Sequence, residues 1–521
     1  MEILHSSNER PTISEITPDA EPISEKTGTT EKDTELYQKD NNVNNELQSS
    51  KKPLSFHWAF IGLASSLFVF QMDATCLGMA LPTIAGDLGS TNLQSLWANL
   101  AYTLCGLSMQ PVWASISDAF GRKPPLFVSM GLFFIGSIVF AIAKNMNTII
   151  IGRVLQGFGG GGIDVLSEVI LADMTTLQER SKYLGLMGIP SAIGNILGPC
   201  VGALFSTYAS WRWIGWMNLP FLGAATPLLF FFLKLRPFKL DASLGGNVAR
   251  LDWIGMMLLI IGITIFVLPL SWAGSLFPWA SWQTLLPMLL GILVLVGFGF
   301  YEAYPVSPVV LHRLFHSVTA NMTLAGVFFH GAVLVSLLQY LPLLYQSVQL
   351  ETPIMSAVAL LPTVITSVVF AVISMMMGIG VAMLRLSLLP MSASVKHVND
   401  TGLAIALLLA VRMFGDLVGL TVASTIFNTT FSTSISSSSM DLTGSLAPLY
   451  DAANSVNFIG ELRTLDISAS ILDPVLRVYL KCFQNIFYTM AGLAGLGLLA
   501  SFFIAGIDLN RNDLGDQASE E

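Results

Sequence analysis

Long apolar stretches, separated by short polar connections, dominate the chain from about residue 57 onward. A helix needs about 20 predominantly apolar residues to cross the hydrocarbon core of a bilayer. The clearest such stretches lie near 57–80, 95–116, 125–143, 148–171, 184–206, 213–234, 253–272, 284–303, 321–343 and 482–504. The pattern therefore predicts an all-α polytopic membrane protein.

The apolar stretches divide the chain into four parts. Residues 1–52 are polar and aperiodic and have no basic start leading into an apolar core, so they predict a disordered cytoplasmic tail rather than a cleaved signal. Residues 53–238 hold six spans with short connections, which predicts a six-helix bundle. Residues 239–306 hold two linker helices, and residues 307–521 hold a second, shorter bundle.

The second half is less regular than the first. Its segment from 356 to 392 is too long for one simple span and contains Arg385. Counting that segment once, together with a further span that contains Arg412 and Gly419, we expect about 12 spans. A Ser/Thr-rich stretch near 428–473 predicts an external loop, where Asn428-Thr-Thr has the pattern of a glycan acceptor.

Composition strengthens the membrane interpretation and excludes a single soluble core. Of the 521 residues, 53% are hydrophobic and 11% are charged, whereas soluble domains carry about 25% charged residues. The net charge of −9 comes largely from the first fifty residues, so nothing in it points to a nucleic-acid partner. The four cysteines have neither disulfide nor metal spacing, which predicts small packing residues and no metal site.

Nothing in the sequence has the pattern of an enzyme. There is no nucleophile and base pair, metal cluster or cofactor loop at a useful spacing. The run Gly157 to Gly162 is not a nucleotide loop, because no Lys-Ser/Thr follows it and it lies within a span. Small residues in a span let neighbouring helices approach closely, so we expect packing there and no cofactor.

Lysine and arginine placement sets the orientation, since cytoplasmic loops carry an excess of both. If the spans alternate, Lys144 and Arg212 fall on one side. The other side holds Lys51, Lys52, Arg122, Lys123, Arg180, Lys182, Lys234, Arg236, Lys239, Arg250 and Arg313. We therefore expect a cytoplasmic amino terminus.

The connection Asp118-Ala-Phe-Gly121-Arg122-Lys123 holds the densest group of charges in a nearly charge-free region. A short connection needs only a turn and some solubility. An acid, a turn and a base in fixed order instead indicate a latch between helix ends.

Ionisable groups within spans are costly and usually functional, and Asp73 and Arg153 are two such residues. Asp73 is either a carboxylate that faces a water-filled cavity and binds and releases a proton, or a group merely solvated at an interface. Arg153 either holds the charge of a neighbouring carboxylate or extends from the span end toward water. Both alternatives stay open at this point.

Other span residues allow weaker predictions. The fifth span has small residues and a proline on one face: Gly194, Gly198, Pro199 and Gly202. This pattern predicts either a bent helix with a close helix contact and a hinge, or ordinary small-residue packing. A lone histidine within a span is more often a hydrogen-bonded packing residue than a proton carrier, and we expect packing of His330. Arg412 and Asp416 are four residues apart, which predicts an ion pair on one helix face with no transport role.

Taken together, these motifs resemble the major facilitator superfamily. Asp118-x-x-Gly121-Arg122-Lys123 is similar to its signature loop, and Asp73-Ala-Thr with Ala80-Leu-Pro82 resembles the first-span motif of its fourteen-helix drug:proton antiporter branch. Arg153 with Gln156-Gly157 resembles that branch's fourth-span motif. Gly194 to Gly202 resembles its antiporter motif. The resemblance covers nearly the whole chain beyond residue 52.

The resemblance implies roles for these residues. Asp118 and Arg122, with Gly121 and Lys123, would form a cytoplasmic latch that favours the outward-facing state, and Asp173 and Arg180 would join its network. Asp73 and Arg153 would be the proton-coupling pair. The Gly198-Pro199 kink would bias the protein toward export.

The fold implied is two helical bundles plus two linker helices. The function implied is proton-coupled export of small amphipathic or hydrophobic molecules such as drugs, toxins or secondary metabolites. A monomer in the cell membrane, with substrate, protons and the lipid bilayer as partners, is expected. Alternatives are proton-coupled or vacuolar transport of a nutrient, siderophore or amino acid, and an inactive truncated carrier.

The chain departs from the family pattern in both halves. Ala114 and Ala203 stand where glycines are usual, which we expect to tune helix contacts. Against the resemblance, the eleventh helix and most of the twelfth are missing, because Ile373-Ser374 runs directly into Gly378-Ile-Gly380. The second bundle is therefore predicted to be shortened by about two helices.

Overall fold

The computed structural model describes residues 52–90, 92–235, 251–273, 277–305, 308–310, 312–360, 362, 391, 400–437, 444–450, 455–456, 458–463, 465 and 468–504. Ten helices within these residues are long and apolar enough to cross a membrane, which confirms the all-α polytopic class. The predicted tail lies outside the described residues except for Lys52. Most of the irregular segment 356–392 also lies outside them.

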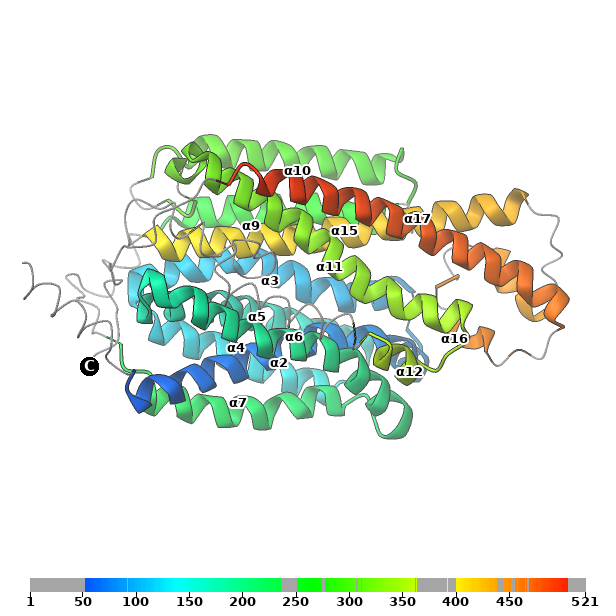
Figure 1. Cartoon of the computed structure of the whole chain (residues 1–521), viewed down its shortest axis with the longest axis horizontal. Helices are drawn as coiled ribbons and strands as arrows, with labels where there is room; N and C mark the ends of the chain where they lie inside the picture. Colours follow the sequence, from blue (N-terminus) through cyan, green and yellow to red (C-terminus); the bar gives the residue numbers. More distant parts are fainter. Residues whose placement is uncertain are drawn as a thin grey trace, which may run out of the picture. The chain divides into compact units, whose positions relative to one another are not determined.

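Six helices make the first bundle, and their long axes run side by side (Figure 1). They are α2 (Leu54–Leu88), α3 (Asn92–Phe120), α4 (Lys123–Ala141), α5 (Met146–Met174), α6 (Leu177–Tyr208) and α7 (Trp213–Phe232). Helix α2 packs on α6 and α7, and α5 packs on α3 and α4. Each predicted span of the first half therefore has a helix, but α3 is not among the ten described helices that are long and apolar enough to cross a membrane.

Local sequence explains where these helices begin. Asn145 caps α5, because its side-chain oxygen accepts from Thr148 N at 2.8 Å. Thr176 and Glu179 form a capping box at the start of α6. Between α3 and α4 the chain turns at Gly121, whose φ of +84° is a conformation that favours glycine.

The glycine run of α5 is a packing surface, as its composition predicts. A side chain at Gly161 would come within 2.6 Å of Gly106 O on α3, and one at Gly159 would overlap Ser129 O on α4. Helices α3 and α4 thus approach α5 more closely than larger residues allow. This close packing fixes the position of the polar side chains that α5 carries.

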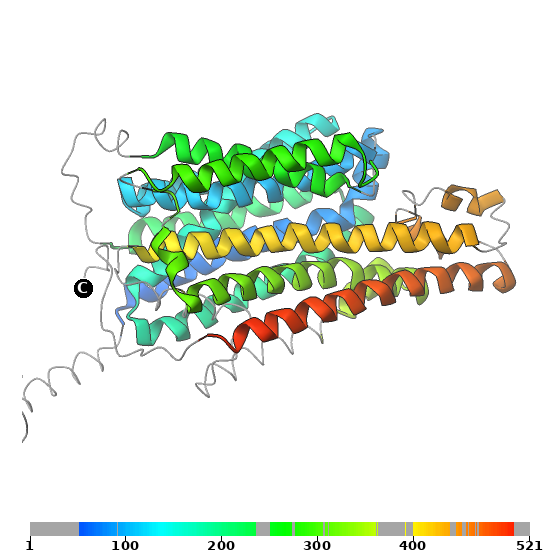
Figure 2. The same cartoon turned by 90° about the horizontal axis from the view of Figure 1, so that it is seen from above.

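Helices α9 (Trp253–Trp272) and α10 (Trp282–Tyr301) pack against each other. They lie at one edge beside α3 (Figure 2). Asp252 caps α9 by accepting from Gly255 N at 2.9 Å. These are the two expected linker helices, and α9 also contacts α15 of the second half.

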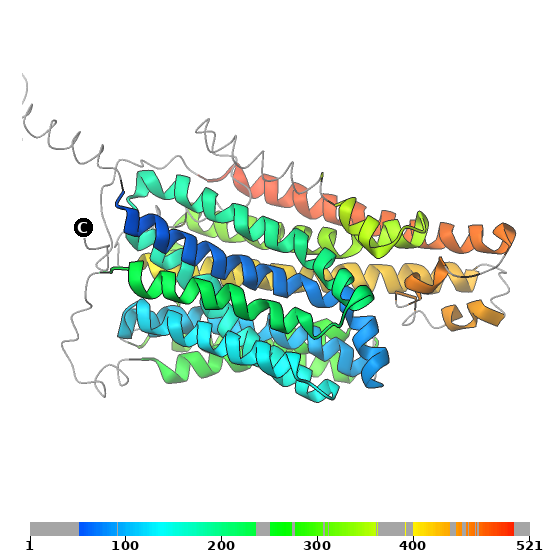
Figure 3. The ribbon, with the colours of Figure 1, turned by 90° about the horizontal axis from the view of Figure 1, so that it is seen from below.

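The second bundle consists of η1 (His312–His316), α11 (Val318–Val348), α12 (Pro353–Val358), α15 (Thr401–Ser437), η3 (Gly444–Tyr450), α16 (Ile459–Leu462) and α17 (Ala469–Ser501). Helix α11 packs against both α15 and α17. The first bundle meets the second where α15 lies against α3 and α5, and where α12 lies against α6. The far ends of α15 and α17 extend beyond the end of α11 (Figure 3).

The predicted loop near 428–473 is wrong over its first part. Helix α15 continues to Ser437, so Asn428 lies within a helix, and α17 begins at Ala469. The reason is packing: Phe427 and Phe431, one helical turn apart, lie against Tyr479 and Phe483 of α17. Glycosylation of Asn428 stays a prediction.

Candidate functional site

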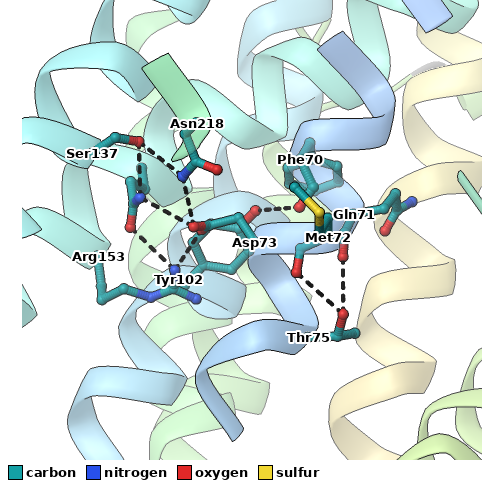
Figure 4. Close-up of polar contacts among 10 residues, drawn as sticks. Phe70, Gln71, Met72, Asp73, Thr75, Tyr102, Ser137, Arg153 and Asn218 are labelled. Atoms are coloured by element: carbon teal, nitrogen blue, oxygen red, sulfur yellow. Dashed lines mark hydrogen bonds and ion pairs between the residues drawn. The ribbon is translucent and has the colours of Figure 1, made fainter. Parts of the chain in front are cut away.

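An ion pair between Asp73 on α2 and Arg153 on α5 lies inside the first bundle (Figure 4). Arg153 Nη1 donates to Asp73 Oδ2 at 2.6 Å, and both side chains are 0% exposed. Transferring either charge alone from water into such a place costs several kcal/mol. The two groups therefore depend on each other and on the hydrogen bonds around them.

Polar side chains from two further helices complete the carboxylate's environment. Asn218 Nδ2 on α7 donates to Asp73 Oδ1 at 2.8 Å, and Gln156 Nε2 on α5 donates to the same oxygen at 3.4 Å. Ser137 on α4 accepts from both amides, at 3.1 Å from Asn218 and 3.0 Å from Gln156. Both oxygens of Asp73 thus have donors, which suits the ionised form.

The guanidinium of Arg153 lies over an aromatic ring. Its carbon is 4.0 Å from the ring centroid of Tyr102 on α3, whose hydroxyl donates to Phe70 O at 2.9 Å. Arg153 Nη1 also donates to Gln156 Oε1 at 3.1 Å. Within the described residues, Arg153 Nε and Nη2 have no hydrogen-bond acceptor, so the ring and one carboxylate stabilise the charge.

The geometry bears on both alternatives left open by the sequence. Arg153 is buried inside the bundle, so it does not extend to an interface. Asp73 is equally buried and does not face open water in this conformation. Their role in proton coupling stays a prediction.

The glycines of α6 face the turn of α2 that carries Asp73. A side chain at Gly194 would come within 2.6 Å of Phe68 O, and side chains at Gly198 and Gly202 would overlap Thr75 and Cys76. Pro199 lies inside the same helix. The small-residue face is thus a close contact between α6 and α2, whereas its action as a hinge stays a prediction.

Three charged groups meet at the end of the bundle where α3 joins α4. Arg122 pairs with Asp118 four residues earlier, and its Nε lies 2.9 Å from Asp173 Oδ2 at the end of α5. Ser117 Oγ accepts from Arg122 Nη1 at 2.7 Å. Burial raises the pKa of Asp118, with Arg122 opposing the rise. Arg122 therefore joins α3 to α5.

The other two basic residues assigned to the latch bind backbone. Arg180 Nη2 donates to Ala172 O at 2.6 Å. Lys123 Nζ donates to Phe230 O at 3.0 Å and Leu233 O at 3.1 Å, at the end of α7. Both residues fasten helix ends instead of pairing with Asp118 or Asp173.

The latch also touches the second bundle. A side chain at Gly402, in the first turn of α15, would come within 2.9 Å of Arg122 Nη2. Beside it, Arg313 of η1 pairs with Asp400. The start of α15 therefore lies against the charged end of the first bundle, and the Arg313–Asp400 pair fixes it to η1.

The predicted ion pair between Arg412 and Asp416 is wrong in this conformation. Arg412 Nη2 instead lies 3.0 Å from Asp164 Oδ2 on α5, across the boundary between the bundles. Gln110 Nε2 on α3 donates to the same oxygen at 2.8 Å. A four-residue spacing permits a pair within α15 but does not exclude a stronger partner on a neighbouring helix.

Sequence reasoning missed three members of the Asp73 site. Asn218 lies in the apolar sixth span, and nothing in the sequence around it indicates a contact with Asp73. Serine and tyrosine are common in apolar helices, and the positions of Ser137 and Tyr102 follow no distinguishing spacing. Their shared signal is a polar group within an apolar run, which the sequence alone cannot assign to a partner.

The family model of the Major Facilitator Superfamily matches residues 63–419. The chain belongs to this superfamily. It is therefore a multi-pass membrane transporter, and the predicted resemblance of the chain to this superfamily is confirmed.

One relative shows the same membership, and two further proteins resemble the chain more distantly. The MFS-type transporter sphD of Aspergillus fumigatus is 64% identical over 97% of this chain and 96% of its own length. The efflux pump FUS6 of Gibberella moniliformis is 37% identical over 61% of this chain, and the chain spans 57% of that relative. The structure of the proton:xylose symporter XylE is similar at 14% identity, with a TM-score of 0.45, covering 86% of this chain and 94% of that one.

The alignment with the Aspergillus fumigatus relative is longer than this chain. It runs over 555 positions, 34 more than the 521 residues available (555 − 521 = 34). At least 34 positions therefore place residues of the relative opposite gaps in this chain.

Proposed function

We propose that this protein is a proton-coupled antiporter of the cell membrane that exports small amphipathic or hydrophobic molecules. The observation that carries the proposal is the fully buried Asp73–Arg153 pair, which joins α2 to α5. A carboxylate within a span is costly, and residues of this kind usually have a function. Relatives that are named efflux pumps support the direction of transport.

The hydrogen-bond pattern suggests how a proton changes this site. As a carboxylate, Asp73 accepts from Arg153, Asn218 and Gln156. Protonation turns one acceptor oxygen into a donor and removes the counter-charge of Arg153, so the arrangement must rearrange. A proton that enters or leaves Asp73 therefore acts on α2, α5 and α7 together.

The contact between α2 and α6 carries this change to the rest of the bundle. The α6 glycines lie against backbone within five residues of Asp73, so a shift of the α2 turn displaces α6 without an intervening side chain. Helix α6 in turn contacts α12 of the second bundle. Alternating access requires this kind of transmission between bundles.

The charged loop would act as a latch on the conformation. Arg122 binds Asp118 and Asp173 of its own bundle and lies against Gly402 of the other. With the orientation given by lysine and arginine placement, this contact closes the cytoplasmic side. The described conformation then corresponds to the outward-facing half of the cycle.

Substitution of Asp73 tests the proposal. In cells that express the protein and are loaded with rhodamine 6G, we expect Asp73→Asn to abolish the dye efflux that a proton uncoupler also abolishes. Asn keeps the hydrogen-bonding shape but cannot exchange a proton. The matched control is Asp87→Asn on the same helix, where Asp87 accepts from Trp211 at 3.0 Å; it should leave efflux unchanged. Undiminished efflux by Asp73→Asn removes Asp73 from coupling.

A second candidate, a shortened carrier without transport activity, is favoured by one observation. The relative at 64% identity carries at least 34 positions that this chain lacks, and the sequence predicts a loss of about two helices between Ile373 and Gly380. Sequencing the transcript across these codons tests it. If the transcript holds forty to fifty further codons at this point, the second bundle is complete and this candidate is ruled out.

A further inference from the structure

The pair between Asp164 and Arg412 lies between the two sites described above. Along α5, Asp164 follows Arg153 by eleven residues and precedes Asp173 by nine, or about 16 Å and 13 Å at the rise of a helix. It joins α5 to α15, which belong to different bundles. Neither latch nor proton-coupling motif includes it.

This pair is less completely bonded than the Asp73 pair. Asp164 is 0% exposed, yet within the described residues its Oδ1 has no hydrogen-bond partner. The neighbouring Gln110 Oε1 also has none there. The site therefore holds buried acceptor oxygens with capacity for a proton or a donor.

A second carboxylate is close to the same arginine. Asp416 lies one helical turn after Arg412, in the electrostatic field of both Arg412 and Asp164. Its Oδ1 would lie 2.7 Å from a side chain at Gly331 of α11. In the part of the chain that the structure describes, no basic nitrogen lies within 4.0 Å of Asp416. The guanidinium of Arg412 thus lies in the electrostatic field of Asp164, Glu168 and Asp416, and its ion pair is with Asp164.

We propose that Arg412 exchanges Asp164 for Asp416 during transport, which makes Asp416 a second proton-binding site. While Arg412 holds Asp164, Asp416 keeps a proton, because a charged carboxylate within a span is costly without a cation. When α15 moves away from α5, Arg412 pairs with Asp416. The O–H bond of Asp416 then breaks and its proton passes to water on the side that has opened.

Arg412 has one carboxylate partner in both conformations. In the closed conformation the three groups are neutral together. In the open one they carry one net negative charge, which resides on Asp164 and is hydrated as the boundary between the bundles opens. The closed conformation holds one proton more than the open one. This inference rests on the proposed function, because that proton would be released to the cytoplasm as the carrier turns inward.

Other ionisable groups around the pair are few. Helix α5 contributes Glu168, which interacts electrostatically with Arg412. Helix α3 contributes Tyr102, which interacts electrostatically with Asp164. Helix α11 adds His330 beside Gly331. Helix α9 has no ionisable residue. On α17, Tyr479 lies opposite Phe427 and Phe431, more than ten residues from Asp416 along α15.

The two carboxylates make opposite predictions, which gives a sharp test. Asp416→Asn cannot offer Arg412 an anion, so it should favour the closed conformation. Asp164→Asn removes the cross-bundle partner, so it should favour the open one. A merely structural role for both residues predicts shifts in the same direction.

The measurement is the distance between spin labels at Lys182 of α6 and His316 of η1, both exposed, after the four native cysteines are replaced by alanine. The long distance belongs to the open conformation and the short distance to the closed one. In nanodiscs at pH 7 we expect the ratio of the long-distance to the short-distance population to fall about tenfold in Asp416→Asn and to rise about tenfold in Asp164→Asn. In the otherwise unaltered protein, the long distance should gain population as pH rises from 5 to 9. Asp416→Asn should remove that dependence.

Controls separate this inference from the proposed function. Arg412→Lys keeps a cation and should retain both distances, and Asp87→Asn should change neither. Shifts of the same sign, or none, in the two Asn variants overturn the exchange even if Asp73→Asn abolishes efflux. Opposite shifts together with normal efflux by Asp73→Asn would uphold the exchange and overturn the role of Asp73.

Discussion

Among the described residues, two ion pairs with a fully buried carboxylate have similar chemistry and different construction. Asp73 and Arg153 join two helices of one bundle, and amides from α5 and α7 and a tyrosine ring from α3 surround them. Asp164 and Arg412 join different bundles, with Gln110 as a further neighbour and the arginine side chain 13% exposed. The first is enclosed on all sides, and the second lies on a boundary that transport must open.

This difference follows from what each pair does when it breaks. Separating Asp73 from Arg153 leaves both charges inside one bundle. Among the described residues no other ion pair includes either of them, so protonation of Asp73 is the change that can remove the charge. Separating Asp164 from Arg412 leaves the arginine one turn from Asp416. Partner exchange is therefore available only at the boundary between the bundles.

The largest expected effect is on Arg153. Arg153→Ala leaves Asp73 charged and buried, which should lower the free energy of unfolding by about 3–5 kcal/mol and abolish efflux. Arg412→Ala should cost clearly less stability, because Asp164 can gain water at the boundary. Thermal unfolding in detergent, monitored by tryptophan fluorescence, checks this order. Equal losses in the two variants would contradict the distinction between enclosed and boundary pairs.

Charge reversal sharpens the comparison. The double variant Asp164→Arg with Arg412→Asp keeps one cation and one anion across the boundary. It should restore a large part of the efflux that Asp164→Arg alone loses. Exchanging Asp73→Arg with Arg153→Asp should restore none, because Asn218 and Tyr102 are placed for the present arrangement. Dye efflux from expressing cells measures both exchanges. Recovery at Asp73 comparable to that at Asp164 would show that its surroundings are not selective.

The sequence predicted the members of the enclosed pair but not the arrangement around them. Asp73 and Arg153 are charges within apolar spans, so their cost alone marks them. Asn218 and Ser137 come from α7 and α4, and their meeting at Asp73 depends on glycine contacts that position whole helices. Polar residues of ordinary type give no sign of such a meeting.

The boundary pair and the end of α15 show where local patterns mislead. Arg412 and Asp416 have the spacing of a helical pair, yet the guanidinium reaches Asp164 because α5 and α15 are in contact. Serine and threonine near Asn428 favour a loop in water. Within α15 their hydroxyls donate to carbonyls one turn earlier, as Ser436 does to Ser432, and aromatic packing on α17 continues the helix.

A smaller effect is expected at Asn218. Asn218→Ala removes one donor to Asp73 and should lower stability by about 1–2 kcal/mol, the cost of an unsatisfied buried acceptor. The matched control is Asn485→Ala on α17, where Asn485 donates to Thr430 Oγ1 at 3.2 Å in a partly buried place; it should lose about half as much. The same thermal measurement serves both. A loss at Asn485 as large as that at Asn218 would mean that the Asp73 site gains nothing from its donor.

The smallest effect concerns a carboxyl outside both pairs. Burial raises the pKa of Glu302, just after α10, from 4.5 to about 7. A raised folded-state pKa gives stability that is present below pH 4.5 and is lost as pH rises to 7. Glu302→Gln should therefore be more stable than the parent at pH 8, by on the order of 1 kcal/mol, and closer to it at pH 5. Melting temperatures across this range that run parallel for the two proteins would show that Glu302 does not titrate there.

The measurement that tests proton-coupled export most directly uses purified protein in liposomes. Vesicles loaded with rhodamine 6G and a pH indicator are diluted into dye-free buffer at the same pH, beside vesicles without protein. As dye leaves down its gradient, an antiporter draws protons inward, so we predict acidification of the lumen, absent in Asp73→Asn. No protein-dependent change in pH, or an alkaline shift as dye and protons leave together, would contradict the account.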